Sequence, residues 1–354
     1  MRAAGLFKIM QPAVYGGYEY GFDALIETAA VVGAGCGSAG WVFSLCVVHQ
    51  WLAALFPKQA QDEYFADPDV VAAGSYAPVG KAVPADGGYR LSGNWSFTSG
   101  CDHAHWLLLG GMIPPAGEGA PPRAAFFFLP RADVTFDDTW FTMGLAGTGS
   151  KNTIANDVFV PAHRVVAVAD LLAGTTPGSR VHDNALYRQS MLATIPFTLV
   201  APILGVAEGA LADFVDMAKV RTTRGAVAGG NSRMAEFATI QSRVAEATGS
   251  IDAARLSIFH ALEKASNAAI AGEPADRDLR LRNRLSQAFS MRLLVQAVDA
   301  LFLASGGQGI FTGKPIQRAW RDAHAGAVHV SLNWDAVSTM YGQHALRLDP
   351  KGQY

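Results

Sequence analysis

The sequence predicts an α+β protein in which helices predominate, and three observations support this. In the first part of the chain, apolar residues such as Phe22, Leu25 and Ile26 recur at helical spacing. Between about residues 68 and 165, short apolar runs alternate with turn residues, as in a small antiparallel β domain. After about residue 195, apolar residues return at three- and four-residue intervals over much longer stretches. We therefore expect three domains, over residues 1–67, 68–165 and 166–354.

In the first domain, Trp51, Leu52 and Leu55 extend the helical pattern. The segment Gly35-Cys-Gly-Ser-Ala-Gly40 matches the dinucleotide-binding pattern G-x-G-x-x-G, and Asp62 follows at roughly the distance of a ribose-binding acid. That motif needs a strand before it, however, and the residues before it here have helical periodicity. We therefore expect these glycines to serve close helix packing.

The second domain begins with an apolar run at residues 70–76 and a turn at residues 78–80. Asp86-Gly87-Gly88 is a strong hairpin signal between two such runs. Further strands are predicted over residues 106–110, 124–129 and 153–160, and Pro161 ends the last of them. These strands predict an antiparallel sheet.

The last domain carries a continuous apolar seam from Met234 to Leu262 and a second long helical pattern over residues 281–305, which ends at Gly306-Gly307. Two more helices are predicted over residues 203–221 and 319–346. Four long helices of this kind are typical of an antiparallel bundle.

Composition excludes several classes of function. Of the 354 residues, 50% are hydrophobic and 16% charged, and the net charge of −2 gives no electrostatic reason to bind nucleic acid or an anionic membrane. The three cysteines lack Cys-x-x-Cys spacing, which favours a reducing compartment. We expect no membrane-spanning run of about 18 apolar residues and no signal peptide. The expected location is the cytoplasm.

Two stretches carry candidate chemistry. In Gly88–Gly100, Phe97 and Ser99 stand two residues apart, so regular strand geometry places them on one face. An aromatic ring and a hydroxyl there could cover a flat heteroaromatic ring and bond to its edge. In Arg321–His329, two histidines occur with no carboxylate between them. Because histidine titrates nearest neutrality, the two stretches suggest a flavin-type site with histidine as the acid or base. His324 and His329, five residues apart, do not stack on one helix face, and we expect no metal site.

Several longer motifs resemble the acyl-CoA dehydrogenase fold. They are Gly88–Gly100, Met143–Ser150 with Asp157–Pro161, and Gly306–Gly309 with Ile316–Ala323. Within that fold, further motifs are more similar to the oxygenase components of two-component flavin-dependent aromatic monooxygenases, such as those acting on a phenolic seco-steroid or on 4-hydroxyphenylacetate. These motifs are Met10–Pro12 with Tyr15–Gly17, Cys36–Trp41, Ser75–Pro78, Ser99–His103 and Trp320–Gly326. The resemblance implies an N-terminal helical domain, a central antiparallel β-barrel, a C-terminal four-helix bundle and a homotetramer.

The same resemblance implies an activity and its site. Reduced FMN or FAD would come from a separate flavin reductase, react with O₂ to a C4a-hydroperoxide, and hydroxylate a phenolic substrate ortho to its OH. Ser99 would lie at the flavin N5 and Phe97 beside the ring, while His49 and Ser75 would face the substrate hydroxyl. His329 would lie by both the flavin and the substrate. Other implied flavin contacts are Trp95, Thr148, Ser150 and Arg221 with Arg224, although core packing, loop capping and a solvated helix end are open alternatives for them.

Three other functions stay open at this point. An acyl-CoA dehydrogenase needs a carboxylate base, but the corresponding region reads His329-Val-Ser-Leu-Asn333, with no acid before Asp335. An N- or S-hydroxylase on the same fold would turn over without a phenol, and an inactive scaffold would bind no flavin. Family members also usually begin with one more helix before Ala4–Phe7. We therefore expect either a true start upstream of Met1 or the loss of one wall of the pocket.

Overall fold

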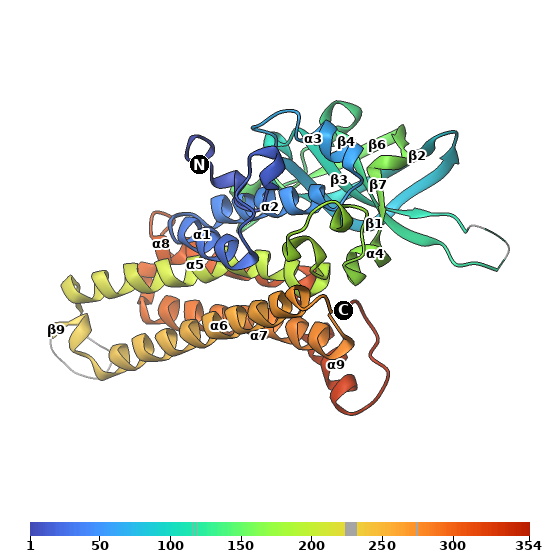
Figure 1. Cartoon of the computed structure of the whole chain (residues 1–354). Coiled ribbons are helices and arrows are strands. Elements are labelled where there is room, and N and C mark those ends of the chain that lie inside the picture. Colours follow the sequence, from blue (N-terminus) through green and yellow to red (C-terminus); the bar gives the residue numbers. More distant parts are fainter. Residues whose placement is uncertain (116, 118, 224–231, 274) are drawn as a thin grey trace.

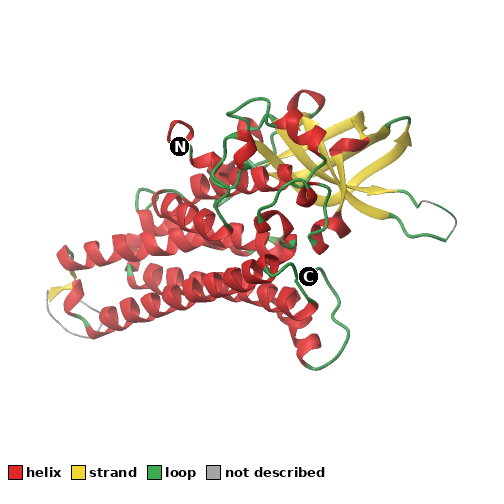
Figure 2. Ribbon diagram, viewed as in Figure 1, coloured by secondary structure: helices red, strands yellow, loops and turns green. Residues whose placement is uncertain are grey.

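A computed structural model describes residues 1–354 except 116, 118, 224–231 and 274. Its sheet lies at one end of the molecule, and the long helices extend away from it (Figures 1 and 2). Helices occur both before and after the strands in the chain. They are α1 (Phe22–Gly35), α2 (Gly37–Ala54), α3 (Lys58–Tyr64), α4 (Val168–Ala173), α5 (Met191–Val220), α6 (Ala238–Ile270), α7 (Arg277–Ala304), α8 (Pro315–Ala327) and α9 (Trp334–Ala345).

A seven-stranded sheet has the order β5-β6-β2-β1-β3-β4-β7. Its strands are β1 (Ala72–Ala85), β2 (Gly88–Thr98), β3 (Trp106–Ile113), β4 (Arg123–Pro130), β5 (Thr135–Asp137), β6 (Lys151–Pro161) and β7 (Val165–Ala167). The predicted hairpin is confirmed, because β1 and β2 pair through a turn in which Gly87 has a φ of +73°. A second, two-stranded sheet joins β8 (Thr222–Thr223) to β9 (Ser232–Arg233).

The sheet differs from the expectation in two ways. It is open, with β5 and β7 as its edges, so the predicted closed barrel is not confirmed. It is also not wholly antiparallel, because β1 and β3 run parallel, with Ala72 opposite Trp106. A parallel pair needs a crossover connection. Here β2 and the turn after it make that crossover. The turns in the sequence predict instead that consecutive strands pair as antiparallel neighbours.

Helix α5 lies at the centre of the helical part. It packs against α1 and α2 on one side and against α6 and α7 on the other. At Pro202, inside α5, α1 and α2 come so close that a Cβ on Gly33 would lie 2.4 Å from the Pro202 carbonyl oxygen. Gly37 and Gly40 likewise lie against other helices and serve helix packing, as expected, whereas a Cβ on Gly35 would meet open space.

Two helices, α5 and α7, are long and apolar enough to cross a membrane by length and composition alone. The expectation that no apolar run approaches such a length was therefore wrong. In α5, 78% of the most apolar window is buried inside the protein. Its position between two groups of helices explains this composition, since it has little surface facing water.

The predicted helix over residues 319–346 is in fact two helices. The first, α8, ends at Ala327, and a short 3₁₀ turn over Val330–Leu332 separates it from α9. His329 lies directly before this turn and caps it. The break places His329 in a loop against α7, where a continuous helix would not put it.

Candidate active site

One face of α2 organises the candidate site. Ser38, Val42, Leu45 and His49 follow one another at intervals of four, three and four residues, which places them on the same side of the helix. Ser38 accepts a hydrogen bond from the Gly147 backbone at 3.2 Å. A Cβ on Gly100 would lie 2.9 Å from Val42 Cγ1. This α2 face therefore lies against the end of β2 and the glycine-rich loop 143–150.

His49 is at the inner end of the α2 face and only 2% exposed. Its Nε2 lies 3.0 Å from the Tyr76 hydroxyl, and its Nδ1 makes no hydrogen bond with a described residue. Burial lowers the pKa of His49 to about 4, an effect that the Leu45 carbonyl partly opposes. The imidazole is therefore neutral at pH 7.

The sequence analysis did not identify Tyr76 as the partner of His49. Tyr76 stands in the quoted motif Ser75–Pro78 and stacks on Phe126 at 5.1 Å. Gly74, on the same face of β1, approaches the His49 ring, while the Ser75 hydroxyl donates to the Ser96 carbonyl at 2.9 Å. Strand alternation separates Ser75 from the side that faces His49. That alternation was the signal that could have identified Tyr76.

His329 lies at the other end of the α2 face. Its ring is 6.0 Å from that of Trp41, and its Nδ1 accepts a hydrogen bond from the Ser331 backbone at 3.2 Å. In the neutral imidazole the proton is therefore on Nε2, which becomes a donor. Burial and the nearby positive charge of Arg284 lower the pKa of His329 to about 4.

Phe97 stands at a break in β2. Trp95 pairs with Thr153 and Thr98 with Lys151, so β2 carries one extra residue there. Phe97 takes a left-handed φ of +66° and is 68% exposed, and its ring lies 6.0 Å from that of Trp140. A bulky residue in this conformation is rare and occurs mainly at functional sites. The expectation that Phe97 and Ser99 share a face by regular alternation was wrong, because this β-bulge turns Phe97 outward.

Ser99, Ser150 and Thr148 form a chain of buried hydroxyls. The Ser99 and Ser150 oxygens lie 2.7 Å apart, as do those of Ser150 and Thr148. Thr148 in turn donates to the Leu145 carbonyl at 2.8 Å. Thr148 and Ser150 thus reach Ser99, and the loop joins the end of β2 through side chains.

Helix α8 holds the glycine-rich loop in place. The Asp322 carboxylate accepts a hydrogen bond from the Leu145 backbone at 2.7 Å, and Arg321 donates to the Met143 carbonyl. Leu145 is buried with a left-handed φ of +49°. Such backbone strain persists only where the surroundings fix it, and Asp322 provides that support.

The remaining predicted flavin contacts lie elsewhere. Trp95 is fully buried in the core of the sheet, where its Nε1 donates to the Gly110 carbonyl at 2.7 Å, so its position gives no support for contact with a ligand. Arg221 ends α5 and donates to the Ser305 carbonyl at the end of α7, at 2.9 Å. Arg224 lies outside the described residues. His324 bonds to Asp299 at 2.9 Å and serves the α7–α8 contact.

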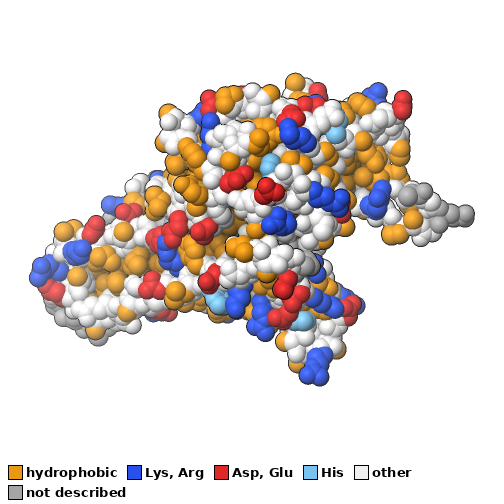
Figure 3. Space-filling model, viewed as in Figure 1, with side chains coloured by type: hydrophobic (Ala, Val, Ile, Leu, Met, Phe, Trp, Pro, Cys, Tyr) orange, Lys and Arg blue, Asp and Glu red, His pale blue; other side chains and the backbone are white. Residues whose placement is uncertain are grey.

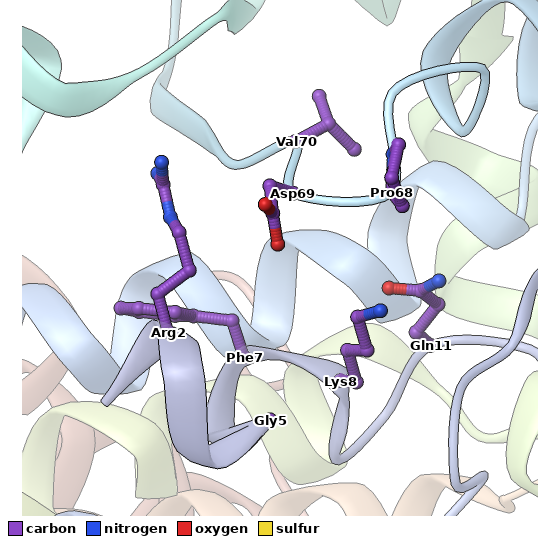
Figure 4. Close-up of a pocket in the computed structure, with 8 residues that line it drawn as sticks. All are labelled: Arg2, Gly5, Phe7, Lys8, Gln11, Pro68, Asp69 and Val70. Carbon is purple, nitrogen blue, oxygen red and sulfur yellow. The ribbon is translucent and has the colours of Figure 1, made fainter.

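Two small pockets lie apart from these residues. The first is lined by the N-terminal segment and the connection before β1, and in it Arg2 and Lys8 lie on either side of Asp69 (Figure 4). The second lies where α1, α2, α5 and α8 meet, beside Gly35 and Asp322. Neither lining includes His49, Ser99 or His329.

The residues at the end of β2 fit a flavin. The exposed Phe97 ring beside Trp140 offers an apolar edge for a flat ring, and Ser99 offers a hydroxyl for its polar rim. The neutral imidazoles of His49 and His329 both lie along α2, His49 as one of its residues and His329 beside Trp41. A flavin held there would supply redox chemistry that the side chains themselves lack.

Comparisons with known proteins agree with this chemistry. Residues 197–334 match the family model "Acyl-CoA dehydrogenase, C-terminal domain". The chain is 47% identical to the FADH₂-dependent resorcinol hydroxylase, oxygenase component, of Rhizobium sp. (strain MTP-10005). The match covers 100% of this chain and 88% of that protein.

Solved structures show the same similarity. The 3-HSA hydroxylase from Rhodococcus sp. RHA1 is 36% identical with a TM-score of 0.92, covering 99% of this chain and 89% of that one. The protein XiaF from Streptomyces sp., solved with FADH₂ and glycerol, is 30% identical with a TM-score of 0.89, covering 99% and 88%. The chain has an acyl-CoA dehydrogenase-like fold, and it belongs to the oxygenase components of the two-component flavin-dependent monooxygenases.

Proposed function

We propose that this chain uses O₂ and reduced flavin to hydroxylate a phenolic ring ortho to its OH. The flavin is reduced FAD or FMN from a separate flavin reductase. Relatives named for resorcinol and 3-HSA, and a structural relative with FADH₂ bound, support this substrate class and this cofactor. When bound, the reduced flavin supplies the electrons that activate O₂.

The observation that carries the proposal is the pair of neutral imidazoles along the α2 face. Trp41, which contacts His329, and His49 are eight residues apart on one helix. At 1.5 Å per residue this separation is about 12 Å, which suits one substituted benzene ring between the two ends. Leu45, between them, is only half-buried, whereas its neighbours Ser44 and Cys46 are buried.

Each imidazole has its own task. His49 Nε2 accepts a proton or a hydrogen bond from the phenol, in the place where it now meets Tyr76. Because its pKa is about 4, His49 alone is a weak base, so hydrogen bonding to the phenol is its main contribution. His329 holds a proton at Nε2 and donates it on the flavin side.

A matched pair of substrates tests this function. Protein mixed with chemically reduced FAD and O₂ should convert resorcinol to a trihydroxybenzene. Resorcinol dimethyl ether has no OH to donate and should give no product. The proposal fails if neither resorcinol nor any other phenol is hydroxylated while the reduced flavin is bound, or if the ether reacts as fast as the phenol.

We also propose that the chain acts in the cytoplasm as a homotetramer, with α5–α8 forming the predicted bundle. Hydrophobic atoms gather along the visible face of the long helices (Figure 3). Near the end of α7, Leu303, Ile310 and Phe311 are more than half exposed. Exposed apolar surface on these helices favours an interface between subunits. Light scattering of the purified protein should give four times the 37.4 kDa chain mass.

A further inference from the structure

The chain of hydroxyls that ends at Ser99 has a fixed direction. Each hydroxyl carries one proton, whereas a backbone carbonyl can only accept. Two oxygens 2.8 Å apart need a proton between them, so Thr148 must give its only proton to the Leu145 carbonyl. Thr148 can then only accept at its 2.7 Å contact with Ser150.

The same count continues outward. Ser150 donates its only proton to Thr148, so it must accept a hydrogen bond at its 2.7 Å contact with Ser99. Ser99 in turn donates its proton to Ser150. The three side chains are 7% exposed or less, so water has little access to supply a different partner. The Ser99 oxygen is therefore left with free lone pairs and no free proton.

The two redox states of a flavin differ in how they would bond to this oxygen. In the reduced ring N5 carries a hydrogen and donates, whereas in the oxidised ring N5 has a bare lone pair and accepts. An acceptor-only Ser99 bonds to the first and repels the second. We propose that Thr148 and Ser150 are positioning residues that fix Ser99 as a hydrogen-bond acceptor, so that the site selects reduced over oxidised flavin. This inference rests on the proposed binding of flavin at Ser99.

Two contacts support this chain of hydroxyls, one at each end. The Leu145 carbonyl that takes the first proton belongs to a strained residue, and Asp322 of α8 binds its backbone N–H. Gly100, next to Ser99, donates from its backbone to the Thr148 carbonyl at 2.9 Å. These contacts fix both ends of the chain of hydroxyls, so the folded loop sets which hydroxyl donates to which.

The experiment measures the Kd of reduced FAD, under anaerobic conditions, and of oxidised FAD for each variant. In Thr148→Val the hydroxyl is removed at nearly constant volume, Ser150 can turn its proton to Ser99, and Ser99 gains a free donor. The preference for reduced over oxidised flavin should fall about tenfold, which is the effect of roughly one hydrogen bond. Ser150→Ala should change it in the same direction, and Thr148→Ser should keep the wild-type ratio.

Thr153→Val is the matched control. Thr153 of β6 donates to Thr98, the last residue of β2, at 2.8 Å and is equally buried, but it is not part of the chain of hydroxyls. Its ratio of affinities should equal that of the wild type. The inference is overturned if Thr148→Val and Ser150→Ala both keep the wild-type preference, if Thr153→Val loses it equally, or if the wild type has no preference. If the wild type binds neither form of FAD, the proposed function itself fails.

Discussion

At the scale of single residues, the two imidazoles are the groups whose charge matters most. Each is neutral at pH 7 because burial opposes protonation, and each lies beside an aromatic side chain, Tyr76 for His49 and Trp41 for His329. A buried imidazole affects both the stability of the fold and the protons available to a substrate.

The lowered pKa of His49 predicts how stability depends on pH. The pKa falls from 6.5 in the unfolded chain to about 4 in the folded one, so the unfolded state binds more protons between these values. Stability therefore falls on acidification through this window. Between pH 7 and pH 5, wild type should lose about 2 kcal/mol more unfolding free energy than His49→Gln. Urea unfolding at both pH values measures this, and equal losses would show that His49 is not buried neutral.

His329 should act on product formation more than on flavin binding. His329→Leu removes the Nε2 donor, so product per reduced flavin oxidised should fall about 100-fold. His329→Gln keeps an N–H donor and should recover part of the loss. Single-turnover product yields and the Kd of reduced FAD measure the two effects. An unchanged yield in the leucine variant would remove His329 from the mechanism.

Prediction from sequence was good for residue types and weaker for their partners. Ser99, Thr148 and Ser150, each predicted as a flavin contact, lie together in the structure, and His49 and His329 border one helix face; their contact with flavin stays a prediction. The partner of His49 was missed because strand alternation in β1 turns Tyr76, and not the predicted Ser75, toward His49. The outward turn of Phe97 was missed because a β-bulge depends on the neighbouring strand β6, which local spacing does not show.

At the scale of elements, the glycine-rich loop 143–150 depends on α8. Asp322→Ala removes the acceptor that holds the strained Leu145 backbone. We expect a loss of about 2 kcal/mol in unfolding free energy, because a buried hydrogen bond to a charged group is broken. The affinity for reduced FAD should fall as well, because the loop positions Ser99 through Thr148.

Asp299→Ala is the comparison for this prediction. Asp299 also accepts hydrogen bonds within the α7–α8 contact, from Trp320 and His324, but it makes no contact with the loop. Its variant should lose stability and keep its flavin affinity. If the two variants lower flavin affinity equally, α8 acts through the general stability of the fold and not through the loop.

The helices and strands were largely predictable, and the exceptions have physical causes. Apolar periodicity located α1, α2, α5, α6 and α7, and turn residues separated β1 from β2 and β3 from β4. The break between α8 and α9 was missed because helical spacing of apolar residues continues across it and no proline marks it. The parallel β1–β3 pairing was missed because strand direction is set by long-range contacts.

At the scale of the whole molecule, two helices join its parts: α5 joins the two groups of helices, and α2 joins the helices to the sheet. Helix α5 is shared between the N-terminal helices and the long C-terminal ones, which is why it is buried along most of its length. Helix α2 lies between α5 and the sheet, and it presents His49, Val42 and Ser38 to the strands and the loop. The site is thus built where the two parts meet (Figure 1).

The most direct test is the structure of the protein crystallised without oxygen in the presence of reduced FAD. The account predicts the flavin ring at the end of β2, with its N5 within hydrogen-bonding distance of Ser99 Oγ and His329 Nε2 on the same side. A flavin ring bound away from Ser99, or a carboxylate in the place given to His329, would contradict it.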